Sequence, residues 1–177
     1  MRKLERAGVA VLVIVAAGVA AWWAYGPHAA SVPWPFRGKA EPQTLRITFD
    51  GGGRITDYIE RYSALRLAGG RVIIDGLCIS ACTMVTGLMP ASQVCVTPYA
   101  QLAFHSAAQI DPITGERAHS SEGTRLVWNV YPDKVRALLR AKSWNGEDSK
   151  INEHPDLIYV AGDELRTLIR PCAPSEM

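Results

Sequence analysis

A serine, a histidine and a run of glycines in this sequence have the residue types and spacing needed for hydrolytic chemistry. Ser80 lies in the segment DGLCISACTMVTGL, where a predicted strand gives way to small residues typical of a helix start. A nucleophilic serine needs a base within hydrogen-bond distance and backbone amides directed at the oxyanion. His105, after the apolar run LAF, could be that base, and the glycines at 51–53 could expose amides because glycine has no Cβ.

Each of these features also has an ordinary structural interpretation. A serine at a helix start is commonly an N-cap, a glycine run after a strand is commonly only a turn, and a histidine after an apolar run is commonly a structural residue. The order of the three features along the chain is what indicates a functional site.

The elements that must position these residues alternate between strand and helix. Alternating β-branched residues or short apolar runs predict strands, and apolar residues at spacings of three and four predict helices. The predicted strands are 44–50, 71–75, 92–98, 100–107 and 156–162, and the predicted helical segments are 54–69, 76–89, 120–144 and 162–169. This alternation indicates an α/β fold with right-handed crossovers and a parallel sheet.

The first 25 residues predict a signal anchor or transmembrane helix. A basic leader, MRKLER, precedes an uncharged apolar run from Ala7 to Tyr25, and about 20 such residues cross a bilayer core of roughly 30 Å. The basic leader places its own side in the cytoplasm and exports the remainder. A cleaved secretory signal ending near Ala21 and a buried core helix are the alternatives. Residues 26–43, rich in Pro and Gly, predict a linker, and 44–177 predict the folded domain.

Export would place the four cysteines in an oxidising compartment. Cys78, Cys82, Cys95 and Cys172 are therefore disulfide candidates, with three possible complete pairings, and Cys172 would tie the tail to the core. Free buried thiols and a zinc site are the alternatives, although the sequence has no CxxC pair and we expect no metal. A formal net charge of +2 with no basic block argues against nucleic acid as a partner.

The order of glycine turn, serine segment and histidine strand resembles the proteolytic subunit of the Clp protease, within the Clp and crotonase-like superfamily. The segments that carry the resemblance are FDGGGRI, GLCISAC and TPYAQLAFHSA, and it covers about residues 45–108 well. It implies a ββα spiral domain in which Ser80 is the nucleophile and His105 the general base. It further implies that the amides of Gly52, Gly53 and Ala81 form the oxyanion hole.

The family's catalytic acid falls about 50 residues beyond its histidine, a window that here holds Glu153, His154 and Asp156. Asp156 is the preferred candidate because it precedes the predicted strand and helix that the family also places there. A cysteine nucleophile, Cys78 or Cys82, is the competing interpretation of the serine segment.

These features predict a membrane-anchored, ATP-independent serine hydrolase, a peptidase without a cofactor that acts on peptide or protein segments. The segments with which the family's peptidase docks to its ATPase are not recognisable, and the superfamily readily forms homo-oligomers. One alternative is a catalytically inactive Clp-like domain that binds peptides or partners, or assembles, in the periplasm. A crotonase-like acyl-CoA enzyme is the third possibility.

Overall fold

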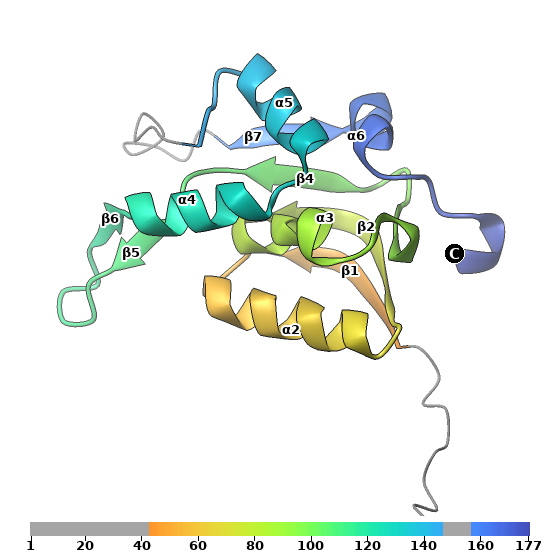
Figure 1. Cartoon of the computed structure of the whole chain (residues 1–177), viewed down its shortest axis with the longest axis horizontal. Helices are drawn as coiled ribbons and strands as arrows, with labels where there is room; N and C mark the ends of the chain where they lie inside the picture. The colour runs from red at the N-terminus through yellow and green to blue at the C-terminus, as the bar shows by residue number, and fades with distance from the viewer. Residues whose placement is uncertain (1–42, 147–156) are drawn as a thin grey trace, which may run out of the picture. The chain divides into compact units, whose positions relative to one another are not determined.

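The first part of the fold is a strand, a helix and a second strand, as the residue periodicity predicts. The computed structural model describes residues 43–146 and 157–177. Strand β1 (Thr44–Asp50) leads through the glycine turn into helix α2 (Ile55–Leu67), and strand β2 (Arg71–Ile79) returns parallel to β1. Helix α2 covers one side of these strands (Figure 1) and directs Tyr62, which is fully buried, into the core.

Strand β2 is the centre of the main sheet and has two partners on its other side. Its first half pairs in parallel with β3 (Val94–Val96), and its second half pairs in parallel with β4 (Gln101–Phe104). Strand β7 (Ile158–Ala161) then pairs antiparallel with β4. The predicted α/β class is confirmed, and the sheet is mixed because its last strand runs in the opposite direction.

The helix predicted over 76–89 is wrong for its first four residues, which extend β2. Gly76 permits this extension, since a Cβ there would lie 1.8 Å from the carbonyl oxygen of Thr48 on β1. The chain becomes helical only at Ser80, as the short 3-10 helix η1 (Ser80–Met84) followed by α3 (Val85–Leu88).

The long helical segment predicted over 120–144 is divided into two helices. Helix α4 (Ser121–Val130) begins at Ser120, whose hydroxyl oxygen accepts the amide hydrogen bond of Gly123 at 3.1 Å, and α5 (Asp133–Ala141) follows Pro132. Proline disfavours helical backbone in the residue before it and cannot donate an amide hydrogen bond, which explains the break. The predicted final helix is confirmed as α6 (Gly162–Leu168).

A hairpin between β4 and α4 was not predicted from the sequence. Strands β5 (Ala108–Ile110) and β6 (Arg117–His119) pair antiparallel and extend away from the main sheet next to α4 (Figure 1). Each strand has three residues, which is too short for the alternation over four to eight residues that identifies a strand.

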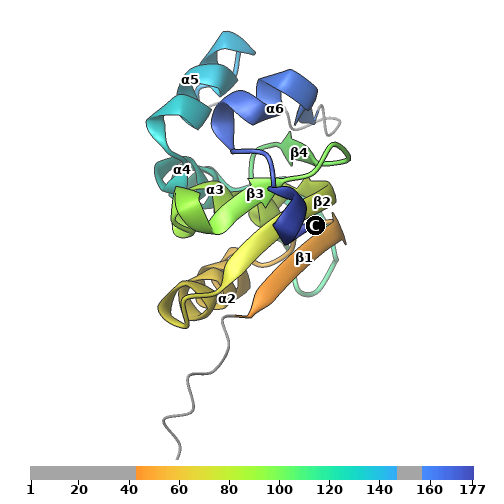
Figure 2. The same ribbon diagram turned by 90° about the vertical axis from the view of Figure 1, so that its right-hand side faces the viewer.

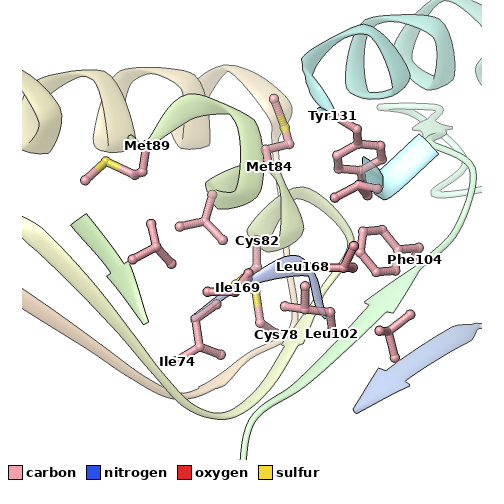
Figure 3. Close-up of a cluster of buried hydrophobic side chains, with 14 of the residues drawn as sticks. Ile74, Cys78, Cys82, Met84, Met89, Leu102, Phe104, Tyr131, Leu168 and Ile169 are labelled. Carbon is pink, nitrogen blue, oxygen red and sulfur yellow. A yellow bond between two sulfur atoms is a disulfide. The ribbon is translucent and has the colours of Figure 1, made fainter. Parts of the chain in front are cut away.

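The core lies between the sheet and the helices that cover it. Figure 3 shows Tyr131 next to Phe104, and Leu102 and the sulfur atoms of Cys78 and Cys82 belong to the same buried cluster. The rings of Phe104 and Tyr131 meet edge to face, with centroids 5.3 Å apart.

The C-terminal tail is fastened to the sheet at several points. Cys95 of β3 and Cys172 form a disulfide, and Glu176 accepts two hydrogen bonds from Arg170 at 2.7 Å. The last residues, in the short helix η4 (Pro174–Glu176), end beside β1 and β2 (Figure 2), where Arg46 donates to the carbonyl oxygen of Met177. The predicted role of Cys172 in tying the tail to the core is confirmed.

The described residues, 43–146 and 157–177, belong to one compact unit. The predicted anchor at 1–25 and all of the predicted linker at 26–43 except Gln43 lie outside the described residues. Within the described ranges, no helix combines the length and apolar character that crossing a membrane requires.

Candidate functional site

The residues predicted to act together lie at the carboxyl ends of three parallel strands. Strand β1 ends just before the glycines at 51–53, β2 ends at Ile79, and β4 ends at Phe104, so that Ser80 and His105 each directly follow a strand. Ile79 and Ala103 are opposite each other in the parallel register. Ser80, His105 and the glycine turn line one open pocket of about 820 Å³.

Ser80 occupies the left-handed region of backbone space, with φ of 59°. Non-glycine residues rarely adopt this conformation, and they are found disproportionately at functional sites, where the surrounding structure holds the strain. The residue lies at a sharp change from strand to helix, a geometry that can present a nucleophile at the edge of a sheet. The Ser80 carbonyl accepts a hydrogen bond from the Thr83 hydroxyl at 2.6 Å, which fixes the turn.

The glycine turn packs directly against Ser80. Gly52 has φ of 81°, and a Cβ on it would lie 2.6 Å from the Ser80 Cβ and 2.8 Å from the Ile79 carbonyl oxygen. Real Cβ atoms do not approach other atoms so closely, and this position therefore requires glycine for both conformation and space.

The amides of the predicted oxyanion hole are not equivalent. The Gly52 amide donates to the Asp50 carboxylate at 3.0 Å and is therefore not free for a ligand. Within the described chain, the Gly53 amide donates to no acceptor. Ala81 lies in the first turn of η1, where amides have no partner inside the helix. Gly53 and Ala81 are consequently the donors still available to an oxyanion.

Asp50 braces the glycine turn and was not predicted as a site residue. Besides the Gly52 amide, its carboxylate accepts hydrogen bonds from the Tyr58 hydroxyl and, at 3.2 Å, from Arg61. Burial, with a smaller contribution from Asp50, raises the pKa of Tyr58 and keeps its hydroxyl a donor. The sequence signal that could have identified Asp50 is an acidic residue placed between a strand and a glycine run.

His105 is partly buried at the edge of the pocket. Burial lowers its pKa below the ordinary histidine value, a backbone hydrogen bond with Ser106 opposes this shift, and the charge of Arg117 adds to it. The neutral imidazole is therefore favoured, which is the form that can accept a proton.

The loop after His105 is fixed to helix α4. The Ala107 amide donates to the buried hydroxyl of Thr124 at 2.9 Å, and the Ala107 carbonyl accepts the Ser120 amide at the same distance. These bonds hold the main chain beside His105 and so limit where its ring can lie.

The described residues do not complete a catalytic triad. Among them, no hydrogen bond links Ser80 to His105, and no carboxylate is among the groups that shift the pKa of His105. The predicted acid, Asp156, lies outside the described residues together with Glu153 and His154, and its role stays a prediction.

All four cysteines are in disulfides. Cys78 bonds to Cys82 across the turn that carries Ser80, and Cys95 bonds to Cys172. The chain has no free cysteine, so neither a cysteine nucleophile nor a thiolate zinc site is available in this state. In the described ranges, no group of histidine, cysteine and acidic side chains is suitably placed for a metal ion.

No protein-family model and no curated protein matches the chain. The similarity to the Clp peptidase therefore stays a prediction from three sequence segments.

Proposed function

We propose that the chain is an exported, membrane-anchored and ATP-independent serine hydrolase, a Clp-like peptidase in which Ser80 is the nucleophile and His105 the general base. The observation that carries the proposal is the conformation of Ser80. Its positive φ and the glycine packed against it support a role as a nucleophile presented at the end of a strand. His105 lines the same pocket, and its neutral form is the kind of base that a serine nucleophile needs.

In the proposed reaction, Ser80 Oγ bonds to the carbonyl carbon of a peptide while His105 takes the hydroxyl proton. The carbonyl oxygen becomes an oxyanion that accepts hydrogen bonds from the amides of Gly53 and Ala81. His105 returns the proton to the leaving amine as the C–N bond breaks. Water then attacks the acyl-enzyme by the same route, which releases the acid and restores Ser80.

The disulfides and the N-terminal apolar run both support the proposed location. Two disulfides are consistent with an oxidising, extracytoplasmic compartment. The apolar run within residues 1–25 would supply the anchor, with the domain on the periplasmic or extracytoplasmic side of the membrane.

A fluorophosphonate probe tests the proposal, because it bonds covalently only to activated serines. We expect the wild-type chain to be labelled, Ser80→Ala and Ser80→Gly to give no label, and His105→Ala to slow labelling about 100-fold or more. Ser80→Gly removes the hydroxyl while relieving the positive φ, so a folding defect cannot explain its loss of label.

Ser143 provides the matched control for this experiment. Among the described residues it is the other non-glycine residue with positive φ, it is exposed, and it does not line the pocket. Ser143→Ala should label like the wild type. A folded wild-type chain that takes up no probe, or labelling that persists in Ser80→Gly, would contradict the hydrolase proposal.

A second function is favoured by the electrostatics of His105. Since no described carboxylate orients its ring, the same pocket suits a catalytically inactive Clp-like domain that binds peptides or a partner, or assembles with copies of itself. That function predicts peptide binding to the full chain with no phosphonate labelling.

A further inference from the structure

The β5–β6 hairpin forms one wall of the pocket, and its register determines which side chains face inward. Ala108 is opposite His119, and Ile110 is opposite Arg117. Directly opposed residues of an antiparallel pair lie on one face, and alternate residues along a strand share that face. Ala108, Ile110 and Arg117 all line the pocket. The register and the lining thus agree that Arg117 lies on the pocket face.

The charges on the pocket wall have one sign. Among the described lining residues, Arg54 and Arg117 carry permanent charge and no aspartate or glutamate is present. The rest of the wall consists of glycines, small apolar residues, hydroxyl groups and His105. A pocket lined in this way favours a negatively charged ligand group.

The two arginines differ in whether their charge is already paired. Arg54 lies 3.9 Å from Asp57 in an ion pair whose side chains are 82% and 60% exposed. No ion pair of the described residues includes Arg117.

Neither acidic residue of the hairpin loop, Asp111 or Glu116, forms an ion pair with Arg117. Asp111 follows β5, and its carboxylate accepts the amides of Ile113 and Thr114 at 2.8 Å within the hairpin loop. Among the described residues, the Arg117 guanidinium is therefore not paired with a carboxylate, and it lies on the wall of the pocket that Ser80 also lines.

We propose that Arg117 is a specificity-determining residue that binds a carboxylate of the substrate, so that the site prefers peptides carrying a negative charge close to the attacked bond. This inference rests on the proposed function only in that it concerns the same pocket. A guanidinium can donate two parallel hydrogen bonds to one carboxylate, which fixes orientation as well as adding affinity. The carboxylate can belong to an acidic side chain or to a free peptide C-terminus.

Peptide binding to the full chain tests the inference separately from catalysis. The probes are fluorescein-labelled, C-terminally amidated alanine-rich hexapeptides with one glutamate at successive positions, the same peptides with glutamine, and the all-alanine peptide with a free C-terminus. Fluorescence anisotropy is measured with Ser80→Gly, so that hydrolysis cannot remove the probe.

We expect at least one glutamate peptide, or the free-acid peptide, to bind about tenfold more tightly than its neutral counterpart, as a charge-assisted hydrogen bond implies. A glutamate effect at one position identifies a side-chain carboxylate, and an effect of the free acid identifies a C-terminal one. Arg117→Gln should remove the preference and Arg117→Glu should reverse it. Arg66→Gln, which changes an exposed arginine of α2 outside the pocket, should leave it intact.

Equal affinity for every charged and neutral pair, or a preference that survives Arg117→Gln, would overturn the inference. Because binding is measured without catalysis, a chain that takes up no phosphonate but discriminates through Arg117 would refute only the hydrolase proposal. A labelled chain that shows no discrimination would refute only the role of Arg117.

Discussion

Ser80 and Gly52 pack against each other in the site, and each has a backbone conformation that side chains disfavour. The positive φ of Ser80 follows from the turn that places it at the end of β2, and the positive φ of Gly52 brings the glycine turn against it. The reactivity of Ser80 should therefore depend on a residue that contributes no side chain.

Gly52→Ala should abolish phosphonate labelling, because the new Cβ would displace Ser80 or the main chain at Ile79. Gly69→Ala is the matched control, since Gly69 has φ of 70° but no atom within 4 Å of the position of its Cβ. Both variants should lose about 1 kcal/mol of stability from the left-handed backbone. Labelling rates and denaturant unfolding measure the two effects, and equal loss of labelling in both variants would contradict this role of Gly52.

The lowered pKa of His105 makes a prediction about pH. A base must be unprotonated to act, and a pKa below the ordinary value keeps it so at lower pH. The acidic limb of the labelling rate should therefore have its midpoint below about pH 6.5.

Replacing Arg117 with glutamine should move this midpoint upward, because the positive charge that disfavours protonated His105 is removed, while burial and the hydrogen bond with Ser106 remain. The rate of labelling between pH 4 and 8 measures both midpoints. A wild-type midpoint above 6.5, or a downward shift in Arg117→Gln, would be inconsistent with the environment described for His105.

At the scale of elements, the site lies where β2 changes into η1, and a disulfide joins the two. Cys78 is the second-last residue of β2 and Cys82 lies in η1, with a sequence separation of 4. The other disulfide, with a sequence separation of 77, joins β3 to the tail. The first bond restrains the local turn, whereas the second closes the long loop between Cys95 and Cys172.

Replacing each cysteine pair with alanines should separate these roles. Loop-closure entropy predicts a loss of about 2 kcal/mol for Cys78 with Cys82 and about 4.5 kcal/mol for Cys95 with Cys172. The phosphonate labelling rate should fall mainly in the first variant, because only that bond encloses Ser80. Labelling of folded protein that is equally affected by both replacements would show that the local bond does not position the serine.

Local sequence patterns predicted most elements of this fold, but not their limits. The apolar spacing in α2 and the β-branched runs of β1 and β2 are strong local signals, and the structure has the predicted element at each of these places. The end of β2 was missed because its small residues also suit a helix, and only the approach of β1 to Gly76 decides between them. Pro132 is a local signal for the break before α5.

The candidate site could be predicted in part for a similar reason. Strand order along the chain brought Ser80, His105 and the glycines together, since parallel strands end at one edge of a sheet. The hydrogen bond between the Gly52 amide and Asp50 depends on a side-chain contact, and the place of Arg117 depends on the hairpin register. Neither can be recognised from local sequence patterns.

At the scale of the whole molecule, polar contacts of Glu176 fasten the C-terminal tail to the sheet. Arg170 and the Ala173 amide bind the Glu176 carboxylate, and Arg71 of β2 lies 3.5 Å from it. The hydrogen bonds from Arg170, followed by that from Ala173, hold the pKa of Glu176 at about 2. The tail thus links residues far apart in the sequence through one acidic group.

Glu176→Gln should lower the Tm at pH 7 and have progressively less effect as the pH falls. A carboxylate whose pKa is lowered by folding stabilises the folded state above its unfolded pKa, and this contribution is lost between the ordinary value of about 4.3 and about 2. Glu116→Gln is the control, because Glu116 is exposed and makes no ion pair among the described residues. Thermal unfolding from pH 2 to 7 measures the difference, and a constant difference across that range would contradict the assignment.

Strand β1 is hydrogen-bonded on one side only, begins at the start of the described chain and delivers Gly52 to Ser80. Mechanical tension applied through the residues before Thr44 would load the hydrogen bonds between β1 and β2 in shear, all at the same time. Sliding of β1 along β2 would change the distance between Gly52 and Ser80, because each residue follows the end of one of the two strands. A protein tethered upstream of this domain would thus couple pulling force to the geometry of the pocket that Ser80 and the glycine turn line.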